Sequence, residues 1–238
     1  MYEERFYRRE IKGSALLTYT VVDVESDLMI YSDKMLQGEV ERWTHYYRSQ
    51  IQAYGQIKPE FFSSLEPLIF MESAPEIVRH MHSASARVGV GPMAAVAGAI
   101  SEYVGRKLMS ECREIIIENG GDIFLKSDEE KCIQIYAGKS PLSNKIALKV
   151  PPSPNGIGIC TSAGTVGHSL SFGRADAVVI LSEDVLLADA VATATGNRVK
   201  AKDQILEGLE FARGVEGVIG VVIIVEDEIG CSGMIELC

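Results

Sequence analysis

The sequence predicts an α+β fold, because strand-like and helix-like segments do not follow the regular strand–helix–strand alternation of a doubly wound sheet. Segments rich in Val, Ile, Tyr and Thr recur along the chain and indicate strands. Elsewhere, apolar residues recur at three- and four-residue steps, which is the period of a helix. Several strand-like segments also follow one another directly, so we expect hairpins.

The composition indicates a packed globular protein. The chain has 238 residues, of which 47% are hydrophobic, and we expect one domain over residues 1–238 with at most two lobes. The 23 basic and 33 acidic residues give a net charge of −10, which argues against nucleic-acid and anionic-membrane partners. The sequence has neither a run of about 18 apolar residues nor an apolar signal segment, so we expect a cytoplasmic protein.

The cysteines favour free thiols. Their number is odd and none of them forms a Cys-x-x-Cys pair. This pattern is typical of a reducing cytoplasm and not of a disulfide scaffold or a structural zinc site. Cys160 and Cys231 are expected to be small buried thiols. The five are Cys112, Cys132, Cys160, Cys231 and Cys238.

The first hundred residues predict strands followed by helices. Val40, Trp43 and Tyr47 share one helical face, and that helix should end by Gly55. Pro92 suits the first turn of a later, alanine-rich helix, where its missing N–H costs nothing. The expected strands cover residues 5–10, 16–24 and 27–32, and the expected helices cover 35–55, 61–65, 76–81 and 93–109.

The second half predicts a hairpin and then further strands and helices. Asn119-Gly120-Gly121 lies between two apolar runs, and both turn positions can take positive φ. Gly196-Asn197 can end a helix of small residues. The expected strands cover residues 114–118, 122–125, 133–136, 146–150, 156–160, 175–181, 217–225 and 231–237, the helices 186–195 and 202–212, and a loop 161–173.

The helix Ala188-Asp-Ala-Val-Ala-Thr193 carries a candidate cation site. Asp189 and Thr193 are four residues apart, so both side chains point from one helical face. A carboxylate and a hydroxyl placed in this way can hold a hard cation beside a phosphate. The alternative is a surface aspartate favoured by the helix dipole, with a threonine bonded to its own backbone.

Three glycine-containing segments could contact a phosphate or a cofactor. The turn at Asn119-Gly-Gly-Asp122 would let a ligand reach the backbone, although on this motif alone an ordinary hairpin is the favoured interpretation. Free N–H groups at Gly89-Val-Gly-Pro92 could receive a pyrophosphate, but the third glycine of the dinucleotide fingerprint is missing. The loop Thr161-Ser-Ala-Gly-Thr-Val-Gly-His168 combines hydroxyls, N–H groups and an imidazole. His168 could transfer a proton, contact a phosphate or cap a carbonyl.

Other polar and aromatic residues give weaker signals. His80 and His82 are two residues apart, so on a helix their rings diverge by about 200° and should not share a metal. Arg87 could contact an anion or be a solvated charge. Trp43 on its aromatic helix could anchor an interface between two copies of the chain, but core packing is the favoured interpretation.

Taken in order, the motifs resemble those of the ApbE family. The hairpin Asn119-Gly-Gly-Asp-Ile123, the Thr161-Ser-Ala-Gly164 loop with its following histidine, and the Ala188–Thr193 helix carry the resemblance. It implies an α+β, ApbE-like (T-fold-like) fold of sheet layers with packed helices. It also implies an FAD-binding, Mg²⁺-dependent enzyme that transfers FMN from FAD to a protein threonine. The run Gly91-Pro-Met-Ala-Ala-Val-Ala-Gly98 is typical of a branch of cytoplasmic archaeal and bacterial members.

The resemblance also assigns a metal site and a catalytic pair. Asp189 and Thr193 correspond to the metal-ligating carboxylate and hydroxyl, and the backbone carbonyl of Ala94 would complete the site. Asp189 and His168 are the expected catalytic residues, with His168 carrying a proton or contacting a phosphate.

The resemblance places the flavin beside two other segments. Gly120 and Gly121 would lie next to the cofactor, and Thr161, Ser162 and His168 would line its pocket. The sequence departs from the family pattern after His168, where Ser169-Leu-Ser-Phe-Gly173 replaces Asp-Pro-x-Thr-Gly. The expected partners are a flavin nucleotide or another small molecule, and an acceptor protein.

Two other functions remain open from the sequence. The branch is associated with sulfur assimilation and homocysteine formation, for which a thiol of lowered pKa, such as that of Cys160, would be needed. The other possibility is a protein with the same fold that binds a ligand or forms an assembly and does not catalyse a reaction.

Overall fold

The computed structural model describes residues 16–164 and 173–238. The predicted strand 5–10 and His168 lie outside these residues. The strands are β1 (Leu17–Asp23), β2 (Ser26–Ser32), β3 (Ile115–Asn119), β4 (Asp122–Ser127), β5 (Lys131–Gln134), β6 (Ala147–Val150), β7 (Ser153–Ser162), β8 (Ala177–Ser182), β9 (Val218–Val225), β10 (Glu228–Gly233) and β11 (Glu236–Leu237). The helices are α1 (Gln37–Ile57), α2 (Glu60–Ser63), α3 (Glu76–Ala86), α4 (Val96–Leu108), α5 (Val185–Arg198) and α6 (Ile205–Arg213), with short 3₁₀ turns η1 (Pro92–Ala95) and η2 (Lys202–Gln204).

The strands form two sheets. The larger has eight strands in the order β1-β2-β3-β4-β7-β8-β9-β10, and the smaller has the order β11-β6-β5. Every strand pairing in the described residues is antiparallel. The α+β class is therefore confirmed.

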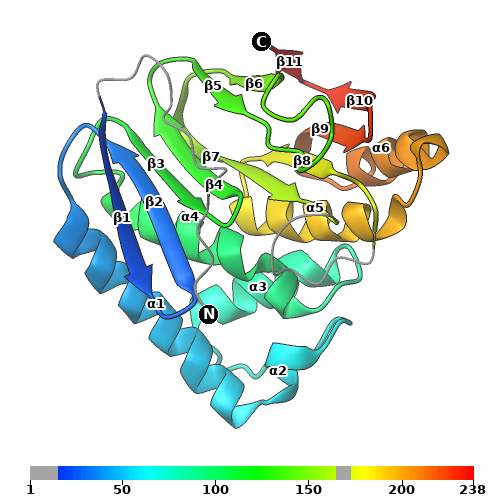
Figure 1. Cartoon of the computed structure of the whole chain (residues 1–238). Helices are drawn as coiled ribbons and strands as arrows, with labels where there is room; N and C mark the ends of the chain where they lie inside the picture. Colours follow the sequence, from blue (N-terminus) through cyan, green and yellow to red (C-terminus); the bar gives the residue numbers. More distant parts are fainter. Residues whose placement is uncertain (1–15, 165–172) are drawn as a thin grey trace.

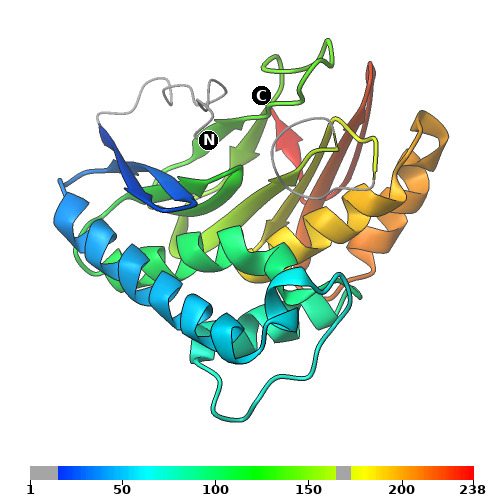
Figure 2. The ribbon, with the colours of Figure 1, turned by 60° about the horizontal axis from the view of Figure 1, so that its bottom comes forward.

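The large sheet separates two apolar cores. The helices cover one of its faces, and the small sheet lies over the other (Figures 1 and 2). Alternating side chains of one strand enter the two cores, as the period of two requires. On β4, Phe124 packs in the helix-side core, whereas Leu125 packs with Leu148 and Val150 of β6.

Most predicted elements are confirmed with shifted ends. The predicted helix 93–109 is divided, because η1 precedes α4. The prediction that Gly196-Asn197 ends a helix is wrong, since α5 continues to Arg198. Gly196 is buried, and a Cβ on Gly173 would lie only 1.7 Å from its carbonyl oxygen. Close packing thus holds this glycine in the helix against its own propensity.

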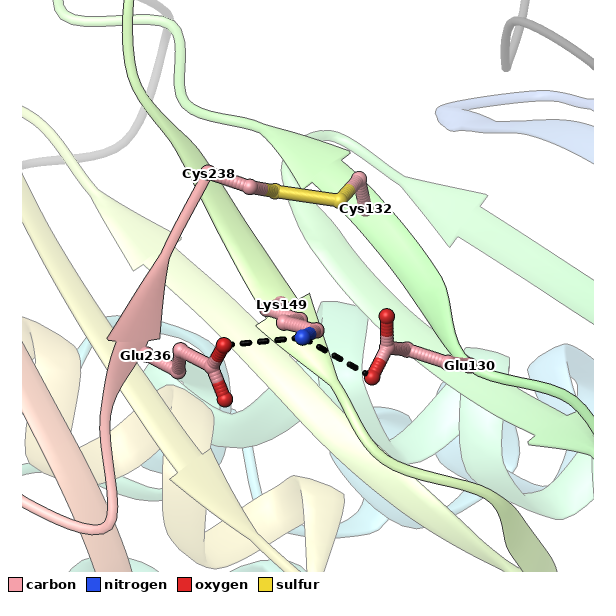
Figure 3. The surroundings of a disulfide bond; sticks show 5 residues. All are labelled: Glu130, Cys132, Lys149, Glu236 and Cys238. Atoms are coloured by element: carbon pink, nitrogen blue, oxygen red, sulfur yellow. Dashed lines mark hydrogen bonds and ion pairs between the residues drawn. A yellow bond between two sulfur atoms is a disulfide. The ribbon is translucent and has the colours of Figure 1, made fainter.

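The expectation of five free thiols is wrong. Cys132 on β5 and Cys238 at the end of the chain form a disulfide (Figure 3). Lys149 lies on β6, the strand between β5 and β11. Its ammonium pairs with the carboxylates of Glu130 at 3.3 Å and Glu236 at 2.8 Å. Cys160 is buried as expected, but Cys231 is exposed.

Trp43 packs within its own chain. Its ring stacks on Tyr47 at 6.1 Å, and the ammonium of Lys107 lies 5.2 Å from the ring centre. Core packing, the favoured interpretation, agrees with these contacts. No helix in the described part of the chain is both long and apolar enough to cross a membrane.

Candidate functional site

Polar side chains of three neighbouring strands, β3, β4 and β7, lie side by side on the helix-covered face of the large sheet. Asn119 pairs with Asp122, and Asp122 pairs with Cys160, which pairs in turn with Ile180. Side chains directly opposite each other on neighbouring strands share a face. Because Cys160, Ile180 and Phe124 belong to the helix-side core, Asp122 faces the helices as well. The register therefore joins residues of two separate sequence motifs.

The hairpin between β3 and β4 is tied to its neighbours by hydrogen bonds. Gly120 and Gly121 have φ values of +68° and +103°, so the Asn-Gly-Gly turn needs glycine for its backbone conformation. The Glu118 carboxylate accepts the Gly121 N–H at 2.8 Å, and the Thr161 N–H donates to the Gly121 carbonyl at 3.2 Å. The predicted hairpin is confirmed, and it lies beside the end of β7.

The start of α4 connects this hairpin to α5. The Asn119 side-chain amide donates to the Ala97 carbonyl at 3.2 Å. One residue later, the Gly98 N–H donates to Asp189 Oδ2 at 2.9 Å. A Cβ at Gly98 would lie 2.7 Å from the Val185 carbonyl oxygen and 2.9 Å from the Asp189 Cβ, so only glycine allows the helices to approach this closely. The free N–H of a helix start thus orients the Asp189 carboxylate.

Asp122 and Asp189 are both buried and are close enough to influence each other's charge. They are 7% and 8% exposed. Burial raises the pKa of Asp189 to about 7, although the N–H groups of Gly98 and Ala97 oppose that shift. Burial, followed by the charge of Asp189, raises the pKa of Asp122 well above its ordinary value. Neighbouring carboxylates with raised pKa values are typical of functional sites.

Cys160 lies in the same environment and is a neutral thiol. It is fully buried, and its Sγ donates to the Val185 carbonyl at 3.4 Å. Burial and then the charges of Asp122 and Asp189 raise the pKa of the thiol well above its ordinary value. A reactive thiolate requires the opposite environment.

The other expected site residues within the described part of the chain lie on the elements that meet at this junction. Thr161 and Ser162, predicted in a loop, are the half-buried last residues of β7, next to the hairpin. Thr193 follows Asp189 by one turn of α5 and is half-buried. Ala94 is half-buried in η1, which leads directly into the start of α4. No group of three His, Cys, Asp or Glu side chains in the described residues forms a metal site, so any cation here requires hydroxyl, carbonyl or substrate oxygens as well.

The weaker candidates are not at this junction. His80 Nε2 lies 3.2 Å from Asp184 Oδ2, whereas His82 Nδ1 lies 3.0 Å from the Leu68 carbonyl. The two rings therefore have separate partners, as their spacing predicts. Arg87 donates to the carbonyl of Glu216.

An open hollow of about 680 Å³ lies elsewhere on the molecule. Its walls include Arg87, Asp184, Leu187 and Arg213, and none of the expected site residues. Both arginines donate to backbone carbonyls there. We therefore place the candidate site at the Asp122–Asp189 junction, where buried charge requires a chemical explanation.

Three residues that build the junction have no individual role in the sequence-based expectations. In the sequence, Asp122 is noted only as the last residue of a turn, and Asn119 and Gly98 are noted only as members of motifs. Motif membership is their one signal in the sequence, because the pairing register and the contact between the helices are not visible in a single chain. Glu102 gives no sequence signal either: it is buried on α4 and accepts the Val185 N–H at 2.7 Å at the start of α5.

The helix-covered antiparallel sheet, with its glycine hairpin and its Ala-Asp helix, has the ApbE-like fold. Residues 8–209 match the family model described as AbpE bacteria, so the chain belongs to that family. It is 44% identical over 193 residues to a UPF0280 protein of Methanococcus aeolicus, covering 79% of this chain and 78% of the relative. It is 38% identical over 230 residues to a UPF0280 protein of Methanosarcina acetivorans, and the match covers 96% of this chain and 88% of the relative.

Solved structures share the fold. The ApbE protein of Thermotoga maritima matches with a TM-score of 0.53 at 12% identity, covering 91% of this chain and 97% of that one. The flavin transferase ApbE of Vibrio cholerae matches with a TM-score of 0.50 at 12% identity, and the match covers 91% of this chain and 96% of that one. At this identity the likeness establishes the ApbE-like fold alone.

Proposed function

We propose that this protein is a Mg²⁺-dependent enzyme that takes FAD as substrate and transfers its FMN portion to a hydroxyl group of an acceptor protein. The observation that carries the proposal is the junction at Asp189. The hairpin, the end of β7, the start of α4 and the Ala-Asp helix meet there through the hydrogen bonds of Gly121, Asn119 and Gly98. These segments are distant in sequence, and all of them belong to the motifs that resemble ApbE.

The residues at the junction fit a divalent cation. Asp122 Oδ1 is buried and has no hydrogen-bond partner among the described residues. Carboxylate, hydroxyl and carbonyl oxygens are the ligands that Mg²⁺ prefers. Asp189, Thr193 and the Ala94 carbonyl would hold the ion, which when bound would neutralise charge that develops on a phosphate during displacement.

The chain's own groups would then position the substrate. The Gly98 N–H fixes the orientation of Asp189. Gly120 is exposed and leaves the backbone of the turn open to a ligand. Thr161 and Ser162 would offer hydroxyls to the flavin nucleotide.

His168 is proposed as the proton carrier. In the transfer, the acceptor oxygen forms a bond to the phosphorus of the FMN portion, the pyrophosphate P–O bond breaks, and AMP leaves. His168 would take the proton of the attacking hydroxyl, a task suited to a group that titrates near neutral pH.

Release of AMP from FAD in the presence of Mg²⁺ tests the proposal. We expect the purified protein to release AMP and to retain FMN covalently on an added threonine-containing acceptor, and we expect Asp189→Ala to abolish both. Asp33→Asn is the control and should keep the activity, because Asp33 directly follows β2 and binds the backbone just before β3, at the end of that strand away from Asn119. A protein that binds no flavin or adenine nucleotide with Mg²⁺ present would contradict the proposal, and binding without AMP release would favour a non-catalytic role.

The sulfur-handling alternative finds no suitable thiol. Burial raises the pKa values of the Cys112 and Cys160 thiols. Cys231 is exposed as a residue, and partial desolvation still raises, and does not lower, the pKa of its thiol. The other two cysteines are bonded to each other. Persulfide formation at any of the three free thiols after treatment with a persulfide donor would revive this alternative.

A further inference from the structure

We infer that Asp122 is a second carboxylate ligand of the cation that the proposed function places at Asp189, on which this inference rests. No motif or resemblance assigns this role, which comes from the geometry of the sheet and from one unpartnered oxygen. Three features support it: the direction of the Asp122 side chain, the hydrogen bonds that the nearby donors already make, and the combined charge of the two buried carboxylates.

The strand register directs Asp122 toward the helices. It is the first residue of β4 and lies opposite Cys160, whose thiol contacts the backbone of α5 at Val185. Two residues along the strand, on the same face, Phe124 packs against Gly105 of α4. The Asp122 carboxylate therefore points into the layer that contains α4 and α5, and Asp189 lies on the part of α5 bonded to Gly98.

One oxygen of Asp122 is sealed from solvent and unsatisfied. The residue is 7% exposed, and no described group donates a hydrogen bond to its Oδ1. A buried acceptor without a partner is unfavourable, and more so if it is charged, so an unsatisfied carboxylate oxygen at this position requires an explanation.

The nearby donors of the protein are already engaged. The Asn119 amide donates to the Ala97 carbonyl, the Gly121 N–H to Glu118, and the Gly98 N–H to Asp189. The Cys160 thiol donates to the Val185 carbonyl and also interacts with the Asp122 carboxylate, as does the Thr161 backbone, yet Oδ1 of that carboxylate remains without a partner. A cation that takes oxygen ligands could instead use this oxygen together with those of Asp189.

The charge of the enclosure also fits a divalent ion. Two carboxylates that converge from β4 and α5 carry up to two negative charges, which one Mg²⁺ neutralises. A buried pair of like charges without such an ion is strongly unfavourable. Mg²⁺ is commonly held by one or two carboxylates together with substrate phosphates, which agrees with a site of two aspartates facing a pyrophosphate.

Calorimetric titration with Mg²⁺ alone, without flavin, tests the inference. We expect Asp122→Asn to weaken Mg²⁺ binding by roughly tenfold or more while raising the thermal midpoint of the metal-free protein. Asp33→Asn is the matched control: this aspartate accepts the N–H groups of Arg113 and Glu114 at 3.0 and 3.3 Å, so its loss should lower the midpoint and leave Mg²⁺ binding unchanged.

The variant Asp189→Asn separates this inference from the proposed function. If Asp189→Asn abolishes Mg²⁺ binding and Asp122→Asn binds like the wild type, the role of Asp122 is overturned and the proposed site remains. If both variants bind like the wild type, both proposals are overturned.

A measurement on the wild-type protein tests the inference even if the variants fail to fold. With aspartate labelled by ¹³C at the side-chain carboxyl, Mg²⁺ should shift the resonances of two buried aspartates, Asp189 and Asp122. A shift of only one buried aspartate resonance would contradict the inference.

Discussion

Burial of Asp189 and Asp122 opposes the charged state of both side chains. A folded protein gains nothing in stability from two neighbouring buried carboxylates, and natural sequences keep such arrangements where function requires them. The two buried carboxylates therefore destabilise the metal-free protein when they are charged, and in the proposed site a bound cation would offset that cost. The pH dependence of stability should reveal that cost directly.

We predict that the free energy of unfolding of the metal-free protein falls as the pH rises from about 4 to about 7. The pKa of Asp189 is raised from 3.8 to about 7, so the folded state binds more protons than the unfolded state in this window, and rising pH disfavours it. Asp189→Asn should flatten this slope and be more stable than the wild type at pH 8, by roughly 1–3 kcal/mol. Urea unfolding at pH 5 and pH 8 measures both quantities, and an unchanged slope in the variant would show that Asp189 titrates normally.

At the scale of elements, the contact between α4 and α5 sets the geometry of the site. Gly98 allows the start of α4 to reach α5, and its N–H orients Asp189. Asp184 begins α5 by accepting the Leu187 N–H at 2.9 Å. Displacement of either helix by a few tenths of an ångström would misplace the carboxylate relative to the sheet.

Gly98→Ala should destabilise the protein by about 1–3 kcal/mol and weaken Mg²⁺ binding, because the new methyl group forces the two helices apart. Gly38→Ala is the control. Gly38 lies in α1 with no atom within 4 Å of the position that a Cβ would take, so alanine there should stabilise the helix by up to about 1 kcal/mol. Thermal unfolding with and without Mg²⁺ distinguishes the two variants, and equal effects would show that the helices tolerate the extra carbon.

At the scale of the whole molecule, local signals are predictable from the sequence and long-range pairings are not. The hairpin at Gly120 and Gly121 and the helix carrying Asp189 follow from turn chemistry and helical spacing, which a single sequence shows. The pairing of Asp122 with Cys160 depends on strand register, and the Cys132–Cys238 bond joins residues 106 apart. Continuation of α5 through Gly196 depends on tertiary packing that overrides propensity.

The disulfide is predicted to fasten the end of the chain to the small sheet. It links β5 to the residue after β11, on the sheet face opposite the helices (Figure 3). Reduction with dithiothreitol, or Cys132→Ser, should lower the free energy of unfolding by about 2–4 kcal/mol, since the bond closes a long loop in the unfolded chain. Cys231→Ser, which removes an exposed free thiol, should change little. Five reactive thiols in the denatured, unreduced protein would show that the bond does not form.

A crystal of the protein soaked with FAD and Mn²⁺, with Mn²⁺ replacing Mg²⁺ as an anomalous scatterer, tests the central claim most directly. We predict one anomalous peak at a bonding distance from an Asp189 oxygen, with the flavin pyrophosphate beside it and the hairpin at Gly120 against the nucleotide. Flavin bound elsewhere on the molecule, or no anomalous peak next to Asp189, would contradict the account.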